Sequence, residues 1–360
     1  MTVVFDNIIY SLQKAGGISN YWHELNRFFL NRAQQHNDVQ PIFIEREDAT
    51  GNLFRQMIQI PAENILREKG PLNVARYAPL ARKISAGDMF HSSYYRVPIA
   101  ARRAVKIVTI HDFTYEFYRR GVARNVNKWQ KKVALHNADG IICISENTKQ
   151  DMLKLYPALD KRKITVIYNG ASNGFFRITC QAARPQLPAE KYAIFIGDRT
   201  GYKNFDFAVR FAGQALSLNL LIVGGGPLSS AEHALLNSHL KDRFQHLQGL
   251  SIEQLNVLYN YAELLIYPSA YEGFGIPVLE AMKSGCPVIA LNSSSIPEVI
   301  ADSRLLMDRL DIDNALSIMD YIEKNRQSVI DAGLRKAEAF SWETSCNSVL
   351  DFYKGFCHTI

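Results

Sequence analysis

The sequence has no closely spaced cysteine pairs and no long hydrophobic run. Its five cysteines are Cys143, Cys180, Cys286, Cys346 and Cys357, an odd number without any Cys-x-x-Cys unit. Neither a disulfide framework nor a zinc site is indicated, and we expect reduced thiols. No apolar run approaches the roughly 20 residues that span a bilayer, and the N-terminal segment lacks the basic flank of a signal peptide. These absences predict a cytoplasmic protein.

Two common nucleotide-binding signatures are also missing. No G-x-G-x-x-G with a downstream acid follows a predicted strand, which argues against a dehydrogenase, and no glycine-rich loop ends in the GKS or GKT of a P-loop. Basic doublets such as Arg119-Arg120 and Lys131-Lys132 lack the aromatic pattern of single-strand binders. We therefore expect no nucleic acid partner.

Charge is divided unevenly along the chain. Residues 1–180 hold 26 Lys+Arg and 15 Asp+Glu, a balance of +11, and residues 181–360 hold the other 15 and 20, a balance of −5. A basic half suits an anionic partner, such as a phosphate-bearing acceptor or the anionic inner face of the cell membrane. A solvated basic surface is the alternative explanation.

Short apolar runs alternate with longer helical patterns, and this rhythm occurs twice. It predicts an α/β chain with two doubly wound, Rossmann-like domains, which agrees with a length of 360 residues. In the first half the predicted strands are 3–5, 39–44, 106–110, 140–144 and 164–167, and the helices are 18–31, 125–137 and 145–155. In the second half the strands are 192–196, 218–223, 244–247, 264–267 and 287–290, and the helices are 204–215, 230–240, 252–260 and 277–284. Residues 50–90 receive no assignment.

Residues 169–190 contain Gly and Pro without periodicity, as an interdomain linker would. We therefore predict an N-terminal domain at 1–170 and a C-terminal domain at 171–341. A final helix at about 342–360 is expected to pack back on the first domain. Two such domains facing each other leave a cleft at the carboxyl ends of their sheets, where such folds bind ligands.

Two short motifs follow predicted strands in the N-terminal domain. Gly16-Gly17 precedes a helix, so amides of the turn can converge on a phosphate, although a tight turn before a helix explains the pair equally well. His111-Asp112 ends the strand 106–110, where an imidazole could hydrogen-bond a sugar hydroxyl. An ordinary polar strand end is the alternative there.

The first strand of the C-terminal domain leads into a basic, glycine-containing loop. This loop, Gly197 to Asn204, carries Arg199 and Lys203. The guanidinium fork of arginine and the mobile point charge of lysine together suit a diphosphate. A solvated basic turn is the alternative, but the place at a strand's carboxyl end favours the diphosphate.

The most informative stretch is residues 269–282, SAYEGFGIPVLEAM. Pro277 near a helix start, after two glycines, leaves backbone amides at residues 273–276 available for anionic or hydroxyl oxygens. Glu272 in the loop and Glu280 in the first helical turns are eight positions apart, so they could contact different parts of one long ligand. Carboxylates suit sugar and ribose hydroxyls.

Two further motifs have simpler explanations. Asp311-Ile312-Asp313 matches a D-x-D metal-diphosphate pattern, but it lies at a helix start, where Asp is favoured as a cap. Gly224-Gly225-Gly226 after a strand is explained equally well by a strand-to-helix turn. No metal site is expected.

Taken together, Gly16-Gly17, His111-Asp112, Arg199 with Lys203, and above all Glu272-Gly-Phe-Gly-Ile-Pro-Val-Leu-Glu280 resemble the retaining glycosyltransferases of family 4, or group 1, with the GT-B fold. The match to the family's E-x7-E motif is strong. Supporting landmarks stand in the expected order at residues 145–148, 166–170 and 295–299. The resemblance spans nearly the whole chain.

The resemblance implies a nucleotide-sugar donor held mainly by the C-terminal domain, an acceptor held by the N-terminal domain, and no essential metal or other cofactor. The implied donor-binding residues are Gly16, Gly17, Arg199, Lys203, Glu272, Gly273, Phe274, Gly275, Ile276 and Glu280, and the implied catalytic residues are His111, Arg199, Lys203 and Glu272. In that assignment Lys203 and Arg199 bind the diphosphate, Glu280 the ribose, and Glu272 the transferred sugar. In many members of the family the arginine stands at a different distance in sequence from the lysine. The separation of four positions between Arg199 and Lys203 therefore departs from the family's pattern.

The implied reaction is hexosyl transfer with retention, in which the acceptor hydroxyl attacks the face that the diphosphate leaves and the phosphate takes the proton. The resemblance to mannosyltransferases of surface-polysaccharide assembly suggests GDP-mannose as donor and a glycan or lipid-linked acceptor. Two alternatives stay open: a non-catalytic subunit that binds nucleotide or glycolipid, and a nucleotide-sugar epimerase.

Overall fold

The computed structural model describes residues 1–100, 103–179, 190–300 and 302–357. The chain divides into two compact units: unit 1 comprises Met1–Asn169 with Trp342–Ile360, and unit 2 comprises Gly170–Ser341. This division falls one residue from the boundary that the sequence predicts. Cys180 and residues 180–189 of the predicted linker lie outside the described residues. Four cysteines are free thiols, of which Cys357 is exposed and Cys143, Cys286 and Cys346 are buried.

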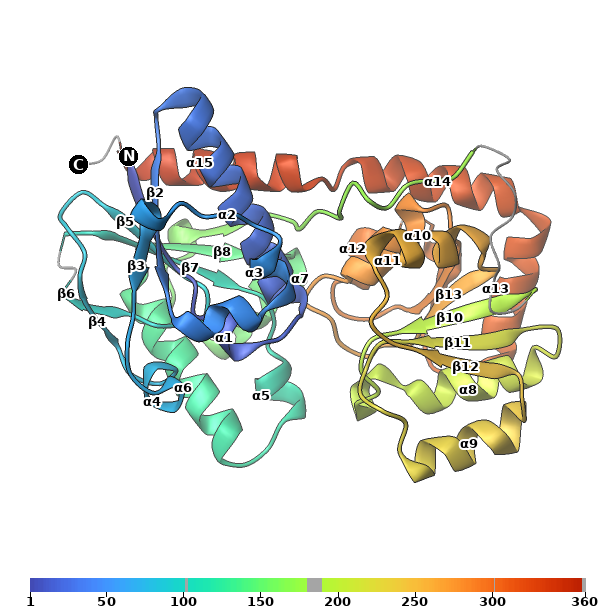
Figure 1. Cartoon of the computed structure of the whole chain (residues 1–360). Helices are drawn as coiled ribbons and strands as arrows, with labels where there is room; N and C mark the ends of the chain where they lie inside the picture. Colours follow the sequence, from blue (N-terminus) through green and yellow to red (C-terminus); the bar gives the residue numbers. More distant parts are fainter. Residues whose placement is uncertain (101–102, 180–189, 301, 358–360) are drawn as a thin grey trace. The chain divides into compact units, whose positions relative to one another are not determined.

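Unit 1 is built on a seven-stranded sheet of order β3-β2-β1-β5-β7-β8-β9, in which every pairing is parallel. Its strands are β1 (Thr2–Asp6), β2 (Gln40–Glu45), β3 (Ile65–Arg67), β5 (Met89–Ser92), β7 (Val105–Ile110), β8 (Gly140–Cys143) and β9 (Ile164–Val166), while β4 (Leu80–Lys83) pairs with β6 (Pro98–Ala100). Its helices are α1 (Ile9–Leu12), α2 (Gly17–His36), α3 (Leu53–Gln56), α4 (Leu72–Ala75), α5 (Thr114–Tyr118), α6 (Val122–Asn137), α7 (Glu146–Leu155) and α15 (Trp342–Cys357). Helices α2 and α15 cover one face of the sheet and α6 covers the other (Figure 1).

Unit 2 repeats the doubly wound plan with a six-stranded parallel sheet of order β12-β11-β10-β13-β14-β15. Its strands are β10 (Tyr192–Ile196), β11 (Asn219–Val223), β12 (Phe244–Leu247), β13 (Leu264–Tyr267), β14 (Val288–Leu291) and β15 (Leu306–Met307). Its helices are α8 (Phe205–Gln214), α9 (Ser230–Leu240), α10 (Ile252–Tyr261), α11 (Ile276–Lys283), α12 (Ile296–Val299), α13 (Ile312–Lys324) and α14 (Arg326–Glu338). Helices α8 and α9 lie on one face, and α10, α11 and α14 lie on the other (Figure 1).

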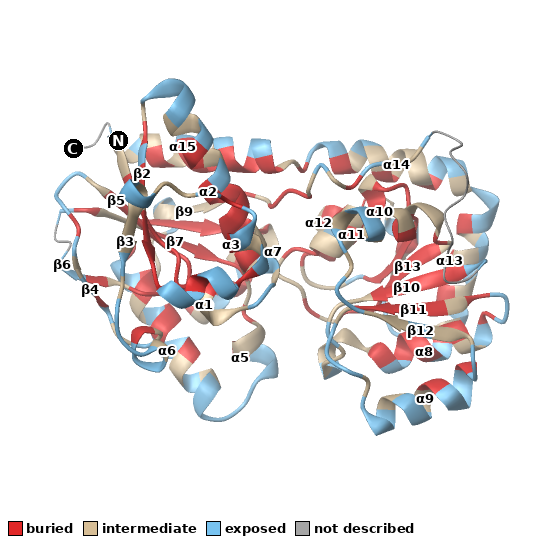
Figure 2. Ribbon diagram, viewed as in Figure 1, coloured by how far each residue is buried: buried red, intermediate tan, exposed pale blue. Residues whose placement is uncertain are grey.

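Local sequence explains where these elements begin and why the strands are buried. Serines cap three helices: Ser145 accepts a hydrogen bond from the amide of Thr148, and Ser229 and Ser251 form capping boxes with Glu232 and Gln254. The central strands consist of apolar runs that are buried on both faces, as parallel strands between two helical layers must be (Figure 2).

The predicted α/β class is confirmed, and all ten predicted strands are present within one residue of their predicted ends. The final helix is present as Trp342–Cys357 and packs on α2 of unit 1, whereas residues 358–360 lie outside the described ranges. The linker prediction is corrected in part, because residues 171–179 pack on unit 2. There the amides of Phe176 and Ile178 donate to the side chains of Asn256 and Asn260.

Candidate functional site

Three loops meet at the carboxyl edge of the unit 2 sheet. They follow β10, β13 and β14, which are neighbours in the sheet, and comprise residues 197–204, 268–275 and 292–295. The first two loops are joined directly, because the Ala270 amide donates to the Tyr202 carbonyl at 2.8 Å and the Asn204 side chain donates to the Pro268 carbonyl at 2.8 Å. The fold thus gathers segments far apart in the chain at the edge where doubly wound sheets bind ligands.

Lys203 and Glu272 form an ion pair between two of these loops. The Lys203 ammonium lies 2.5 Å from the Glu272 carboxylate, and the two side chains are 13% and 14% exposed. Burial of the ammonium works to lower the pKa of Lys203, but the charge and hydrogen bond of Glu272 outweigh it and raise this pKa. Lys203 therefore keeps its positive charge in a sheltered place, where it acts more strongly on an anion than an exposed lysine would.

The backbone of Glu272 is held by the third loop. Its amide donates to Ser294 Oγ at 2.8 Å, and its carbonyl accepts from Ser295 Oγ at 3.0 Å. Ser294 adopts a left-handed backbone with φ of 50°, which a serine rarely does. This role of Ser294 was not predictable from the sequence, because a single serine after a strand forms no recognisable pattern.

The start of α11 presents two available amides. Gly275 has φ of 104° and caps the helix, and a Cβ built there would lie 2.8 Å from Ile296 Cδ1. Glycine is required at this position both for the backbone angle and for the close packing. The amides of Gly275 and Ile276 donate to no group within the part of the chain that the structure describes. They are thus available to oxygens of a ligand.

Glu280 lies in the second turn of α11 and is half-buried. Burial, opposed in part by the charge of Lys283, raises the pKa of Glu280 to about 8. Among the described residues its carboxyl group has no hydrogen-bond or ion-pair partner. A carboxyl group that has lost water without gaining a protein partner is suited to bind hydroxyl groups of a ligand.

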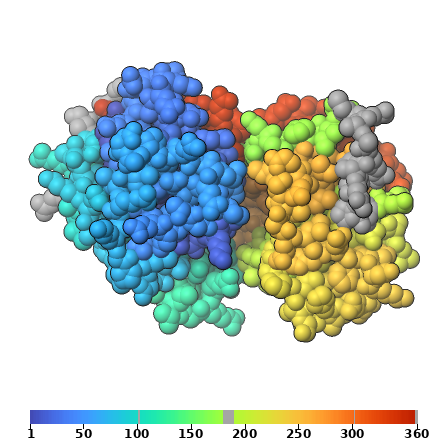
Figure 3. All heavy atoms as spheres, viewed as in Figure 1, coloured from blue at the N-terminus to red at the C-terminus, as the bar shows by residue number. Residues whose placement is uncertain are grey.

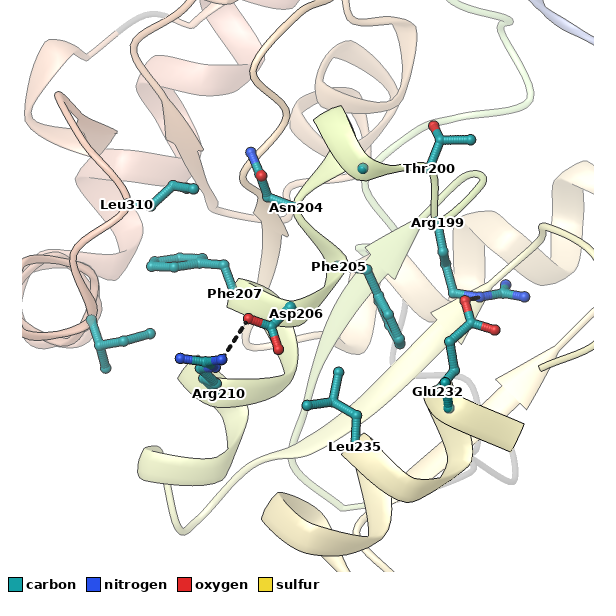
Figure 4. Close-up of a pocket in the computed structure, with 13 residues that line it drawn as sticks. Arg199, Thr200, Asn204, Phe205, Asp206, Phe207, Arg210, Glu232, Leu235 and Leu310 are labelled. Carbon is teal, nitrogen blue, oxygen red and sulfur yellow. Dashed lines mark hydrogen bonds and ion pairs between the residues drawn. The ribbon is translucent and has the colours of Figure 1, made fainter. Parts of the chain in front are cut away.

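Arg199 is engaged within unit 2. Its guanidinium lies 2.6 Å from Glu232 (Figure 4). The guanidinium also donates to the carbonyls of Gly224, Gly226 and Pro227. Arg199 also borders a pocket of about 510 Å³ between α8 and α9, whose lining does not include Lys203 or Glu272. In this geometry Arg199 braces the glycine turn after β11, and its assignment to a diphosphate stays a prediction.

The Gly16-Gly17 turn opens α2 in unit 1, as expected. Gly16 is extended, and a Cβ on Gly17 would meet no atom within 4 Å. A Cβ on Gly16, in contrast, would lie 2.7 Å from Oε1 of the Gln13 side chain. Gly17 is thus required neither by backbone strain nor by packing. The open space beside Gly17 agrees with close approach of a ligand to the helix start.

His111 directly follows β7 in unit 1 and is 6% exposed. Burial lowers the pKa of His111 to about 4. The charge of Asp112 opposes this shift, and the charge of Lys131 adds to it. The imidazole is therefore neutral at pH 7. Its ring packs edge-on against Tyr21 at 5.0 Å, and its Nε2 atom has no hydrogen-bond partner among the described residues. Buried polar atoms are usually hydrogen-bonded, so a hydroxyl group of a ligand could supply the partner of this nitrogen.

A buried lysine anchors the turn after His111. Lys131 of α6 is 1% exposed, and its ammonium donates to the Asp112 carbonyl at 2.9 Å and to the Glu116 carboxylate at 2.9 Å. The aromatic ring of Phe113 lies 4.4 Å from the same ammonium. The basic doublet Lys131-Lys132 is therefore divided between core and surface, because Lys131 is buried and Lys132 is exposed.

The D-x-D motif caps a helix, as predicted: the Asp311 carboxylate accepts from the Asn314 amide at 3.1 Å. Across the described ranges no three His, Cys, Asp or Glu side chains are grouped as metal ligands. None of the helices in those ranges is both long and apolar enough to cross a membrane.

Comparison with known proteins identifies the family. Residues 15–172 match the family described as Glycosyltransferase Family 4, and residues 181–337 match Glycosyl transferases group 1. The chain is 28% identical over 286 residues to the O-antigen chain mannosyltransferase B of Escherichia coli, covering 74% of each protein. Among solved structures it resembles the sucrose-phosphate synthase of Thermosynechococcus elongatus, with a TM-score of 0.75, 19% identity and full coverage of both chains. It also resembles HepE of Anabaena, solved with UDP and glucose, with a TM-score of 0.72 and 14% identity over 98% of this chain and 99% of that one. The chain belongs to the group 1, family 4 glycosyltransferases and has their GT-B fold.

Proposed function

We propose that the protein transfers a hexose, with retention, from a nucleotide diphosphate sugar to a glycan or lipid-linked acceptor in surface-polysaccharide biosynthesis. The observation that carries the proposal is the Lys203–Glu272 pair beside the open amides of Gly275 and Ile276 and the unpartnered Glu280. One ligand bound at this edge of the sheet would then contact the Lys203 cation, the amide donors of Gly275 and Ile276, and the Glu280 carboxyl group. These are the groups that a diphosphate, a sugar and a ribose require.

The proposed roles follow from charge. As the bond between the sugar and the diphosphate breaks, negative charge grows on the leaving phosphate and positive charge grows at the anomeric carbon. Lys203 and the helix-start amides stabilise the phosphate, and Glu272 holds the sugar hydroxyls. Gly273 and Phe274 belong to the same loop, and from unit 1 we assign the Gly16-Gly17 turn to donor phosphate and His111 to the reacting sugar. We propose that no metal ion takes part, since Lys203 already supplies a positive charge.

Mannose from GDP-mannose is the proposed donor group. The support is the similarity to an O-antigen chain mannosyltransferase, whereas the solved complex of HepE contains UDP and glucose. The proposed acceptor binds unit 1, whose sequence carries most of the positive charge. Peripheral contact with an anionic membrane, on its cytoplasmic face, would bring the enzyme to a lipid-linked acceptor.

A transfer assay separates this function from its alternatives. Purified protein with GDP-mannose and a lipid-linked oligosaccharide acceptor should give a mannosylated product with the α-anomeric configuration of the donor, in the presence of EDTA. Release of nucleotide with a 2-epimeric sugar and no transfer would indicate an epimerase. Binding of donor with neither product, across all donors and acceptors tried, would indicate a non-catalytic subunit.

A further inference from the structure

Helix α6 and the turn before it expose large apolar side chains on the surface of unit 1. Phe117 is 45% exposed, Tyr118 42%, Val122 79% and Trp129 57%. They are close in sequence, at the end of α5 and along α6, and Figure 3 shows this green-cyan segment at the molecular surface. We refer to these four residues, with Arg119, Arg120, Lys128 and Lys132, as the α5–α6 surface.

The same segment is basic without any acidic residue. Residues 117–137 hold six Lys+Arg and no Asp or Glu. Arg119, Arg120, Lys128 and Lys132 are exposed, and none of them pairs with a described carboxylate. The ion pair found in the segment joins Lys131 to Glu116 and is buried. The exposed positive charge is therefore not neutralised by the protein.

Helix geometry places the α6 members of this surface, Val122, Lys128, Trp129 and Lys132, on one face of the helix. Val122 and Trp129 are seven positions apart, two turns of helix, and point away from the buried positions Gln130, Lys131 and Ala134. Lys128 and Lys132 are exposed beside Trp129. Long basic side chains can reach the phosphates of a bilayer while an aromatic ring lies deeper, at the level of the headgroups.

We propose that the α5–α6 surface binds an anionic lipid bilayer, with Trp129 inserted at the headgroup level. Charge complementarity selects this occupant, since unpaired cations around exposed aromatic and aliphatic side chains match anionic headgroups over an apolar interior. The buried face of the same helix carries Lys131, which anchors the turn after His111. Contact with the bilayer would thus be made by the helix that positions a proposed sugar-binding residue. The proposal rests on the proposed function only for the identity of the acceptor.

Tryptophan fluorescence tests the proposal on the intact chain. Of the three tryptophans, Trp22 and Trp342 are 0% and 6% exposed, so Trp129 is the one whose emission should change on membrane contact. We expect a blue shift when vesicles with about 30 mol% phosphatidylglycerol in phosphatidylcholine are added at about 50 mM salt, and its loss at about 500 mM salt. The variant Trp129→Phe should bind the vesicles in flotation but lose the shift.

Charge reversal provides the matched comparison. Lys128→Glu/Lys132→Glu should weaken binding to these vesicles at least about tenfold, whereas Lys324→Glu/Arg335→Glu, an equal change of charge at exposed sites of unit 2, should weaken it less than about twofold. Equal weakening in both variants, or no blue shift of wild-type protein at low salt, overturns the proposal. In the second case a protein partner becomes the occupant to consider.

The outcome is separable from that of the proposed function. Vesicle binding is measured without donor or acceptor, so it does not require transferase activity. If transfer to a soluble glycan occurs without vesicle binding, the α5–α6 surface is wrongly assigned while the proposed reaction stands. If vesicles bind but no donor is used, the surface assignment stands and the reaction fails.

Discussion

Lys203 and Glu272 hold opposite charges 2.5 Å apart in a place that water reaches only in part. Removing either charge leaves the other without compensation, so the two side chains act as a unit. In the resting protein each also keeps the other in position at the loop edge. A donor diphosphate would share the Lys203 ammonium, and sugar hydroxyls would share the Glu272 carboxylate.

We predict that Lys203→Met and Glu272→Gln each lower kcat/KM for the donor at least about 10²-fold, because each removes a group that stabilises the transition state. The double variant should lose little more than either single variant. Steady-state kinetics give the comparison, and Arg210→Met, from the exposed Asp206–Arg210 pair of the same unit, is the control with unchanged kcat/KM. Near-wild-type turnover in both single variants would rule out this site.

The raised pKa of Glu280 predicts how the free energy of unfolding depends on pH. In the native protein it holds its proton up to a pH of about 8, whereas in the unfolded chain a glutamate loses it near pH 4.3. The native state therefore binds more protons between these values, and the free energy of unfolding should fall as pH rises from about 5 to about 8, by at most about 1.4 kcal/mol per pH unit. Urea unfolding at several pH values should show this decline reduced in Glu280→Gln and retained in Glu323→Gln, an exposed control. Equal slopes in all three proteins would contradict the assignment.

At the scale of elements, two glycines at helix starts differ in what they require. Gly275 needs its left-handed backbone and has Ile296 against it, so Gly275→Ala should lower the free energy of unfolding by about 1–3 kcal/mol.

Gly17 begins α2 with open space beside it, so Gly17→Ala should leave stability unchanged or slightly raised. Its methyl group should nevertheless lower kcat/KM at least about tenfold by obstructing a phosphate. Unfolding curves and steady-state kinetics of Gly275→Ala and Gly17→Ala test these two predictions. Full activity of Gly17→Ala would show that the Gly16-Gly17 turn has a structural role and does not bind the donor phosphate.

The elements also show what sequence patterns can and cannot predict. The buried parallel strands were predictable, because apolar runs such as those of β10 and β13 alternate with amphipathic helices. Residues 50–90 gave no assignment because their elements have only three or four residues each, such as β3 with three and β4 with four, too few to show a period. The placement of Lys203 and Glu272 in loops at one edge of the sheet was predictable, because each follows a predicted strand. The roles of Lys203, Glu272 and Glu280 stay predictions. The ion pairing of Arg199 with Glu232 was not, because it depends on how the loop after β11 folds.

Helix α15 follows unit 2 in the chain but belongs to unit 1. Tyr353 of α15 is buried and hydrogen-bonds His91 of β5, which also contacts Thr109 Oγ1 at 2.8 Å. Burial, with the nearby His111, lowers the pKa of His91 to about 3, so the ring is neutral and both nitrogens are hydrogen-bonded. The last helix is thus part of the core of unit 1 and not an appendage.

We predict that Tyr353→Phe lowers the free energy of unfolding by about 1–3 kcal/mol, because it leaves a buried ring nitrogen of His91 without a partner. The increase in Tm that a bound nucleotide produces should stay the same, since neither Tyr353 nor His91 is among the proposed donor-binding residues. Thermal unfolding with and without nucleotide measures both quantities, and Tyr77→Phe, at an exposed tyrosine, is the control. An unchanged Tm in Tyr353→Phe would show that this hydrogen bond contributes nothing to the stability of unit 1.

We propose that the loops after β10, β13 and β14 bind a nucleotide sugar. The most direct test is thermal shift of the protein against GDP-, UDP-, dTDP- and ADP-sugars, because a ligand that binds only the native state raises Tm. We expect that one nucleotide class raises Tm in wild-type protein, and that Lys203→Met and Glu280→Gln abolish or strongly reduce this rise. No rise with any of the four, or an equal rise in wild-type protein and both variants, would contradict it.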